Sequence, residues 1–260
     1  MSDMDLGLAG WNVLVTGGSK GIGLACARAF HAEGARVAIV SRSPANLDAA
    51  KKTLDCYCVA ADLTDAAAAA AMVERVEKDF GALDVLVNCA GAARRTDAAE
   101  LSPEAWHAGM QAKYFSYIHV IDPLIKRMAA RGRGAIVNII GNGGKLPSDT
   151  HLAGGAANAA LMLASAGLAH AYAAKGVRVV GINPGLTRTE RVAEGMKAEA
   201  RRAGISEEAA LSRAMQRQPL GRFAEPEEIA DIALFAASER GRFLTGANIT
   251  ADGVANPTVV

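Results

Sequence analysis

"TGGSKGIG", residues 16–23, joins an apolar run at residues 11–17 to a segment of helical period. Glycines let the backbone turn sharply and approach a pyrophosphate, while the free amides and the dipole of a helix start favour negative charge. The spacing of Gly17, Gly21 and Gly23 differs from the ordinary G-x-G-x-x-G pattern. The stretch predicts a strand, a phosphate-binding turn and a helix; the alternative is a tight turn that binds no ligand.

The rest of the chain alternates short apolar runs with longer segments of helical period. This alternation is typical of repeated βαβ units, and strands of a parallel sheet that are buried on both faces form unbroken apolar runs. We therefore expect an α/β Rossmann fold, a doubly wound parallel sheet in one domain over residues 1–260, with a mobile lid at 188–219. The predicted strands include residues 11–17, 36–42, 83–91, 134–141, 177–185 and 246–253.

Charge and composition limit the partners. The formal net charge is +1, without a long basic run, so a small-molecule substrate is favoured over nucleic acid or an anionic membrane. Cys56 and Cys58 have no second Cys or His pair nearby, which disfavours a metal site and a disulfide framework. The start of the chain shows no targeting pattern, and no apolar stretch is expected to reach the length of a membrane helix. These features predict a cytoplasmic protein without a bound metal.

Four motifs in the same order and spacing resemble the short-chain dehydrogenase/reductase family. They are Thr16-Gly17-x-x-x-Gly21-x-Gly23, Asp62, Asn88-Cys89-Ala90-Gly91, and Pro184-Gly185 followed by Thr189. The resemblance extends from about Leu8 to Gly253 and implies an oxidoreductase that binds a nicotinamide dinucleotide. It also suggests a homotetramer or homodimer that packs through the helices around Lys113 and Leu161.

By this resemblance the first glycine turn binds the pyrophosphate, and the residues near Asp62 contact the adenine. The turn at residues 88–91 supports the ribose and the nicotinamide, and the segment after Pro184 contacts the carboxamide. The cofactor-binding residues implied in this way are Gly17, Ser19, Lys20, Gly21, Ile22, Gly23, Ser41, Arg42, Asp62, Leu63, Asn88, Ala90, Gly91, Pro184, Gly185, Thr187 and Thr189.

The end of the second predicted strand bears on the choice between NAD(H) and NADP(H). Sites that prefer NAD usually place an acid there, which would repel a 2′-phosphate. Ser41 and Arg42 stand at this position instead, and Arg42 can meet a phosphate with a forked contact. Lys20 can add a second positive charge. We therefore expect NADP(H) over NAD(H); the alternative is that both cations are solvated surface charges.

The family's catalytic residues are missing from the positions where the resemblance places them. Gly154 stands at the tyrosine, Asn158 at the lysine, Gly141 at the serine and Gln111 at the asparagine. Asn158 keeps hydrogen-bonding capacity and could hold a cofactor ribose, but it carries no charge that lowers the pKa of a phenol. Because Gly154 and Gly155 lack side chains, we expect a roomier pocket beside the nicotinamide.

Other residues are candidates for the missing proton donor. His151 lies three positions before Gly154, and its ordinary pKa of about 6.5 would make it a usable donor near neutrality; the alternative is a surface histidine. Tyr114 is a second candidate, with packing between helices as its alternative. Lys145 and Asp149 could order substrate or water, although charged loop residues are usually solvated.

Two functions from different classes follow. The first is an NADP(H)-dependent oxidoreductase that transfers a hydride to or from a carbonyl, an alcohol or an activated enone, with His151 as a non-standard donor. The second is a catalytically silent protein that binds NADP(H) as a sensor or partner subunit, favoured by the loss of the four catalytic positions. Non-redox chemistry is a third alternative, which the glycine turn disfavours because such enzymes have little need of a dinucleotide site.

Overall fold

A parallel sheet of seven strands organises residues 5–91 and 94–257, the part of the chain that this computed structural model describes. The strand order reverses between the first and fourth strands, which confirms the doubly wound sheet. The extent of the domain over residues 1–260 stays a prediction. In spatial order the strands are β3 (Tyr57–Ala60), β2 (Arg36–Ser41), β1 (Asn12–Thr16), β4 (Val85–Asn88), β5 (Gly134–Ile139), β6 (Val177–Pro184) and β7 (Asn248–Ala251).

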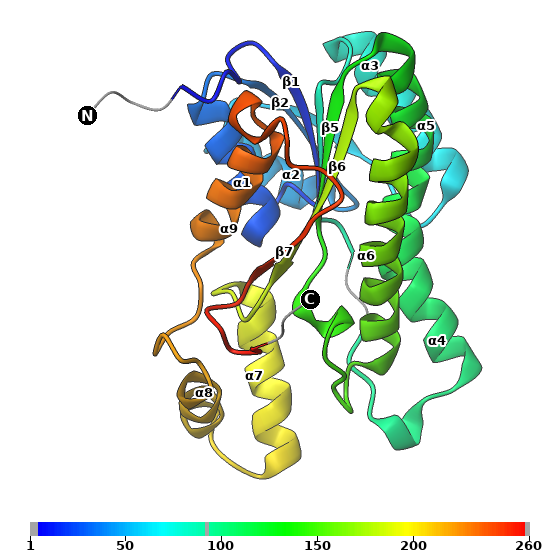
Figure 1. Ribbon diagram of the computed structural model, residues 1–260. Coiled ribbons are helices and arrows are strands. Elements are labelled where there is room, and N and C mark those ends of the chain that lie inside the picture. Colours follow the sequence, from blue (N-terminus) through cyan, green and yellow to red (C-terminus); the bar gives the residue numbers. More distant parts are fainter. Residues whose placement is uncertain (1–4, 92–93, 258–260) are drawn as a thin grey trace.

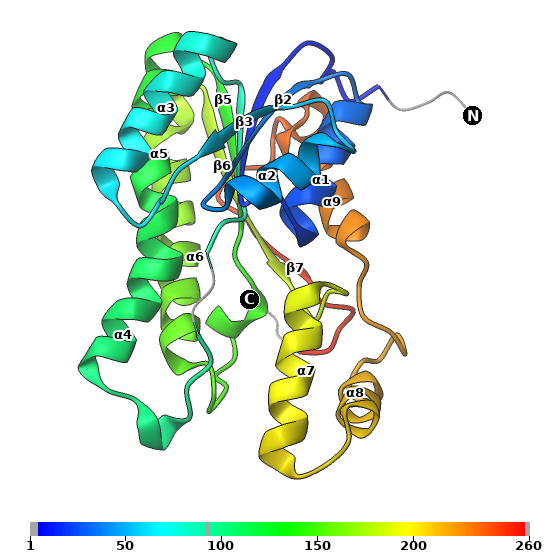
Figure 2. The same ribbon diagram turned by 180° about the vertical axis from the view of Figure 1, so that it is seen from behind.

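Helices cover both faces of the sheet (Figures 1 and 2). One face packs on α1 (Gly21–Ala32), α2 (Pro44–Lys51) and α9 (Pro226–Ala237), and the other on α3 (Ala66–Phe80), α5 (Ser116–Arg131) and α6 (Leu152–Tyr172). Alternate residues of β1 enter opposite cores: Val13 and Val15 belong to the first, and Leu14 belongs to the second. Burial on both faces explains why the strands are unbroken apolar runs.

The remaining helices lie near the carboxyl ends of the strands. The helix α4 (Pro103–Met110) passes through a π-helical turn, η2 (Gln111–Phe115), into α5. The segment predicted as a lid contains α7 (Glu190–Ala203) and α8 (Glu207–Gln216), which lie apart from the sheet in both views (Figures 1 and 2). The mobility of this segment stays a prediction. Short 3-10 turns are η1 (Ala98–Glu100), η3 (Asn142–Gly144), η4 (Ala173–Lys175) and η5 (Glu239–Gly241).

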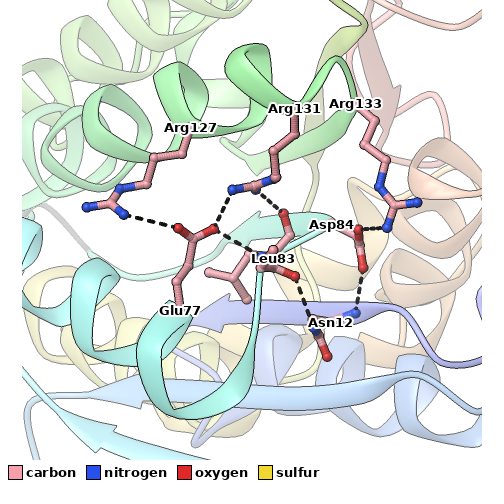
Figure 3. Close-up of polar contacts among 8 residues, drawn as sticks. Asn12, Glu77, Leu83, Asp84, Arg127, Arg131 and Arg133 are labelled. Carbon is pink, nitrogen blue, oxygen red and sulfur yellow. Dashed lines mark hydrogen bonds and ion pairs between the residues drawn. The ribbon is translucent and has the colours of Figure 1, made fainter.

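A network of paired charges ties the elements together at the amino ends of the strands (Figure 3). Glu77 on α3 accepts from Arg131 at 2.9 Å and from Arg127 at 3.4 Å, both on α5. Asp84, just before β4, pairs with Arg133 and accepts the amide of Asn12 at 2.9 Å. Arg127, Arg131 and Arg133 therefore have acidic partners and serve the fold.

One helix departs from the expectation about membrane-spanning segments. The helix over Leu152–Lys175 is long and apolar enough to cross a membrane by length and composition, with a mean hydropathy of 1.4. The expectation that no stretch reaches this length is therefore wrong, because the alanines of this segment raise its hydropathy. The same helix buries Ala157 and Leu161 in the core, and helices of protein cores pass the same test of length and composition.

Candidate active site

The turn between β1 and α1 forms a close-packed glycine cradle. Gly17 and Gly21 have φ angles of +65° and +52°, which disfavour residues with a Cβ. A Cβ on Gly17 would lie 2.8 Å from the Cα of Ala90, and one on Gly23 would lie 2.3 Å from the carbonyl oxygen of Gly17. The N-cap residue, Lys20, makes no side-chain hydrogen bond to the first amides of α1. These amides therefore remain available to an anion.

Hydrogen bonds of buried polar side chains at the ends of β1 and β4 hold the glycine cradle in place. Thr16 Oγ1 donates to Asn88 Oδ1 at 3.2 Å and accepts the amides of Cys89 and Ala90, also at 3.2 Å. Asn88 Nδ2 donates to Asn138 at 3.0 Å. Because Asn88 has no exposed surface, its side chain fixes the turns that follow β1 and β4 and does not itself reach the surface of the site.

Burial also sets the state of the thiol beside Asn88. Removal from water raises the pKa of Cys89 to about 11, against the opposing charges of Lys113 and Arg191. The thiol is therefore protonated at neutral pH and unsuited to be a nucleophile. The structure is consistent with Cys89 as a small packing residue in the family turn.

The carboxyl ends of β2 and β3 carry the residues predicted for the adenosine side. Arg42 is exposed, while Asp62 accepts the amide and the hydroxyl of Thr64 at 3.0 and 2.8 Å. These hydrogen bonds lower the pKa of Asp62, and the charge of Arg42 lowers it further. Lys20 pairs with Glu190 of α7 at 3.1 Å, and both side chains are more than half exposed. An exposed pair of this kind is worth less than about 1 kcal/mol, so it can be exchanged for a phosphate contact.

The turn after β6 brings the start of α7 against the cradle. A Cβ on Gly185 would lie 2.8 Å from the Cβ of Asp252, so this turn also excludes a side chain. Thr187 is buried, and its hydroxyl donates to the carbonyl of Gly185 at 3.3 Å. Thr189 caps α7, and its methyl carbon lies 3.3 Å from the position that a Cβ on Gly21 would take. The predicted residues of β1, β4 and β6 thus meet at one edge of the sheet.

The ring of His151 fills the space beside Gly154, the residue that the resemblance aligns with the family tyrosine. A Cβ on Gly154 would lie 2.1 Å from Cε1 and 2.5 Å from Nε2 of His151. A Cβ on Gly155 would lie 2.7 Å from the carbonyl oxygen of Gly143. The prediction of a roomier pocket at these two glycines is therefore wrong. The imidazole and the loop after β5 occupy that volume, and both glycines are needed for the close approach.

The electrostatic state of His151 also differs from the expectation. Burial, together with the nearby charges of Arg95, Arg191 and Lys113, lowers its pKa to about 4. The imidazole is therefore neutral at pH 7, and the expected pKa near 6.5 is not that of the folded site. Its Nδ1 is buried and has no hydrogen-bond partner within residues 5–91 and 94–257. A neutral ring offers one N–H donor and one acceptor nitrogen.

Further buried polar atoms that have no partner in the described part of the chain lie at the carboxyl edge of the sheet. They are Oδ1 of Asn142, Oδ1 of Asn158, and both side-chain polar atoms of Asn183. Buried polar groups are nearly always hydrogen-bonded, so atoms of this kind indicate partners supplied by a ligand or by water. Asn158, at the position of the family lysine, is 5% exposed. The glycine cradle and these polar atoms together fit a nicotinamide dinucleotide.

Several other predicted residues do not face this edge. The side chain of Gln111 is exposed and donates to the carbonyl of Thr64. Tyr114 packs against the core and meets the ring of Phe115 edge to face, as its packing alternative predicted. Asp149 is exposed. Among the described residues, no hydrogen bond or ion pair joins Gln111, Tyr114 or Asp149 to His151 or Asn158.

Two other side chains complete the account of the predicted residues. Lys145 contacts Thr250 at 2.9 Å. Leu161 is fully buried within the chain, so it cannot itself contact a second subunit.

The structure shows two polar residues that sequence reasoning missed. Lys113, 8% exposed, reaches inward from the π-helical turn, and its Nζ donates to Tyr117 Oη at 2.8 Å. Burial lowers the pKa of Lys113 to about 7. Burial raises the pKa of Tyr117, so its hydroxyl stays protonated. Their burial could have been inferred from the sequence, because Lys113 and Tyr117 are four residues apart and share one helix face with the apolar residues Ile121 and Leu124.

A parallel doubly wound sheet with a glycine cradle at its switch point defines a dinucleotide-binding class of protein. The family model described as enoyl-(acyl carrier protein) reductase matches residues 17–254. D-threitol dehydrogenase of Mycolicibacterium smegmatis is 34% identical over 259 residues, which span 96% of this chain and 95% of that protein. The chain therefore belongs to the short-chain dehydrogenase/reductase family of oxidoreductases.

Solved structures agree with this assignment. L-sorbose reductase from Gluconobacter frateurii, complexed with NADPH and L-sorbose, superposes with a TM-score of 0.92 at 31% identity, covering 98% of this chain and 100% of that one. An NADPH-bound short-chain oxidoreductase from Pseudomonas aeruginosa with an atypical catalytic center superposes with a TM-score of 0.86 at 31% identity, covering 96% and 100% of the two chains. An atypical catalytic center thus occurs in a solved structure of this fold.

Proposed function

We propose that this protein is an NADP(H)-dependent oxidoreductase in which the imidazole of His151 replaces the family tyrosine. The observation that carries the proposal is the position of that ring, within 2.1 Å of where a Cβ on Gly154 would lie. The family tyrosine stands at position 154 by resemblance, so the imidazole lies beside the place where its side chain would begin. The His151 side chain thus supplies a polar group beside position 154, and the glycine at 154 leaves room for it.

The bound dinucleotide supplies the hydride, while the chain binds and orients it. The amides at the start of α1 and the cradle of Gly17, Gly21 and Gly23 bind the pyrophosphate. Arg42 and Lys20 favour the 2′-phosphate of NADP(H), and no acid stands at the end of β2 to bind the ribose of NAD(H). Asn158 Oδ1 accepts a hydrogen bond from the ligand in place of the charged contact of a lysine.

His151 acts as a neutral hydrogen-bond donor toward the substrate oxygen, and the alkoxide left by hydride addition would take its proton from solvent water. Its pKa of about 4 keeps the imidazolium population very small at pH 7, so its contribution is the N–H of the neutral ring. A preorganised donor aimed at the oxygen on which charge develops lowers the barrier without changing its own protonation. A neutral histidine polarises a carbonyl in this way in triosephosphate isomerase.

The experiment is to measure NADPH oxidation with a panel of ketoses and other carbonyl compounds, and NADP⁺ reduction with alditols. L-sorbose, D-threitol and galactitol belong in the panel because relatives are named for them. We expect His151→Ala to lower turnover at least about tenfold, the low end of the effects of positioned acids. The matched control is His170→Ala, an exposed histidine of the same helix, which should change turnover less than about twofold.

Two results would contradict the proposal in different ways. Unchanged turnover in His151→Ala removes this residue from the mechanism and leaves the oxidoreductase intact. Tight NADPH binding with no turnover across the panel supports the silent cofactor-binding protein instead. That alternative is favoured by the absence of side chains at Gly141 and Gly154 and of a charge at Asn158.

We also propose a homodimer or homotetramer through the outer surface of the helices that carry Lys113 and Leu161. Because these two residues are buried, the contacts would come from exposed neighbours such as Trp106, Phe115 and Leu163. Large apolar side chains on an exposed face are typical of interfaces between subunits. Analytical ultracentrifugation gives the assembly size directly.

A further inference from the structure

A buried lysine is fixed at the carboxyl end of β5. Lys113 Nζ lies 2.8 Å from Tyr117 Oη and 2.9 Å from the carbonyl oxygen of Ile139, the last residue of the strand. Tyr117 Oη donates to the same carbonyl at 2.6 Å and has no exposed surface. The phenol and the carbonyl therefore hold the ammonium in one place.

The strand end that holds Lys113 leads directly into the candidate active site. Gly141 follows Ile139 by two residues, and a Cβ on Gly141 would lie 3.4 Å from Nδ2 of Asn158. A Cβ on Gly143 would lie 3.1 Å from Cδ2 of His151. The ammonium thus lies at the base of the loop that contacts both residues.

Among the described residues, the titratable groups that interact electrostatically with Lys113 carry no negative charge at neutral pH. They are the Cys89 thiol from the turn after β4, the Tyr117 phenol from α5, the Arg191 guanidinium from α7 and the His151 imidazole at the start of α6. Removal from water raises the pKa of Cys89 and of Tyr117, which keeps both groups neutral.

Neither Lys113 nor Arg191 forms an ion pair with an acidic side chain in the described ranges 5–91 and 94–257. The cations at the opposite edge differ, because Arg127 and Arg131 share Glu77 (Figure 3). A buried cation without a counter-charge destabilises a fold, and pKa values perturbed by burial concentrate at functional sites.

We propose that Lys113 is the cationic group of this active site, and that its field stabilises the negative charge that develops on the oxygen of a carbonyl substrate. Lys113 would supply the positive charge that the family lysine provides by resemblance and that Asn158 lacks. The inference rests on the proposed function. Lys113 is a positioning residue that acts through the loop and through His151, whose neutral ring its charge favours. Tyr117 keeps the ammonium in place.

The kinetic test compares Lys113→Met with the wild-type enzyme. We expect kcat for carbonyl reduction to fall about 10- to 100-fold, while KM and the Kd for NADPH change less than about threefold. Wild-type kcat should fall as the pH rises through the pKa of Lys113, because the ammonium is lost, and this fall should be absent in Lys113→Met. The control is Lys126→Met, which removes an exposed lysine of the same helix. A kcat for Lys113→Met within threefold of wild type overturns the proposal.

A second measurement needs neither turnover nor cofactor. Titration of the imidazole signals by nuclear magnetic resonance, with His151→Gln to assign one of the five histidines, gives the pKa of His151. Removing the charge in Lys113→Met should raise that pKa, because a nearby cation disfavours the imidazolium. An unchanged pKa means that the field of Lys113 does not reach the site, which refutes the inference. If no substrate is turned over, the proposed function fails, and this titration still decides whether Lys113 acts on the site.

Discussion

The buried ammonium of Lys113 should make the protein less stable than a variant without it. Burial lowers its pKa from an ordinary value of 10.5 to about 7. Below pH 7 both the folded and the unfolded chain hold the proton, and the fall in pKa corresponds to a loss of about 5 kcal/mol of stability. Between pH 7 and 10.5 only the unfolded chain keeps it, so the free energy of unfolding rises with pH. Replacement by methionine removes this loss and keeps a side chain of similar length.

The net gain is smaller than the electrostatic figure because the lysine also makes two hydrogen bonds. Each contributes about 1 kcal/mol, and the bond from Tyr117 to Ile139 remains in the variant. We expect Lys113→Met to raise the free energy of unfolding by about 2 to 3 kcal/mol at pH 7, with the advantage vanishing by about pH 10. Urea unfolding at both pH values measures this. A variant that is destabilised at pH 7, or a difference that does not change with pH, would refute the reasoning.

Three further substitutions test the close contact at Gly154, the charge of Arg42 and the buried hydrogen bonds of Asn88. Gly154→Ala should displace the ring of His151 and lower kcat about tenfold with the helical content unchanged by circular dichroism; an unaltered kcat would contradict the close contact. Arg42→Ala should weaken NADPH binding about tenfold in fluorescence titration and leave NADH binding unaltered. Asn88→Ala leaves the Thr16 hydroxyl proton without its acceptor and Asn138 Oδ1 without its donor, and should lower the free energy of unfolding by about 2 to 4 kcal/mol in urea.

The fold could be predicted from the sequence because its signals are local. The apolar runs at β1, β2, β4, β5 and β6 mark strands buried on both faces, and the glycine turn marks the junction of β1 and α1. The π-helical turn η2 could not be predicted in this way. A Cβ on Gly91 would lie 2.1 Å from the carbonyl oxygen of Ala112 in that turn, so its shape depends on packing between segments distant in sequence.

The π-helical turn makes the side-chain directions in this part of the chain hard to predict from the sequence, and the catalytic role of Gln111 stays a prediction. An extra residue in a helical turn rotates the side chains that follow, so the alignment of one polar residue does not show which residue points inward. Gln111 turns toward Thr64, and Lys113 turns toward the sheet. The state of His151 was equally out of reach, because its pKa depends on burial and on cations from three other segments. Its approach to Gly154, by contrast, follows from their spacing of three residues.

The pH dependence of the effect of His151 distinguishes a hydrogen-bond donor from an acid. With a pKa of about 4, the ring has the same charge throughout the range from pH 5.5 to 8. The ratio of Lys113→Met kcat to the kcat of the double variant Lys113→Met, His151→Ala should therefore stay constant across that range, because neither enzyme carries the lysine that titrates there. A histidine that acted as an imidazolium would give a ratio that increases as the pH falls through about 6.5. Such an increase would show that the bound substrate and cofactor restore the charge of the ring, and would make His151 the proton donor in the ordinary sense.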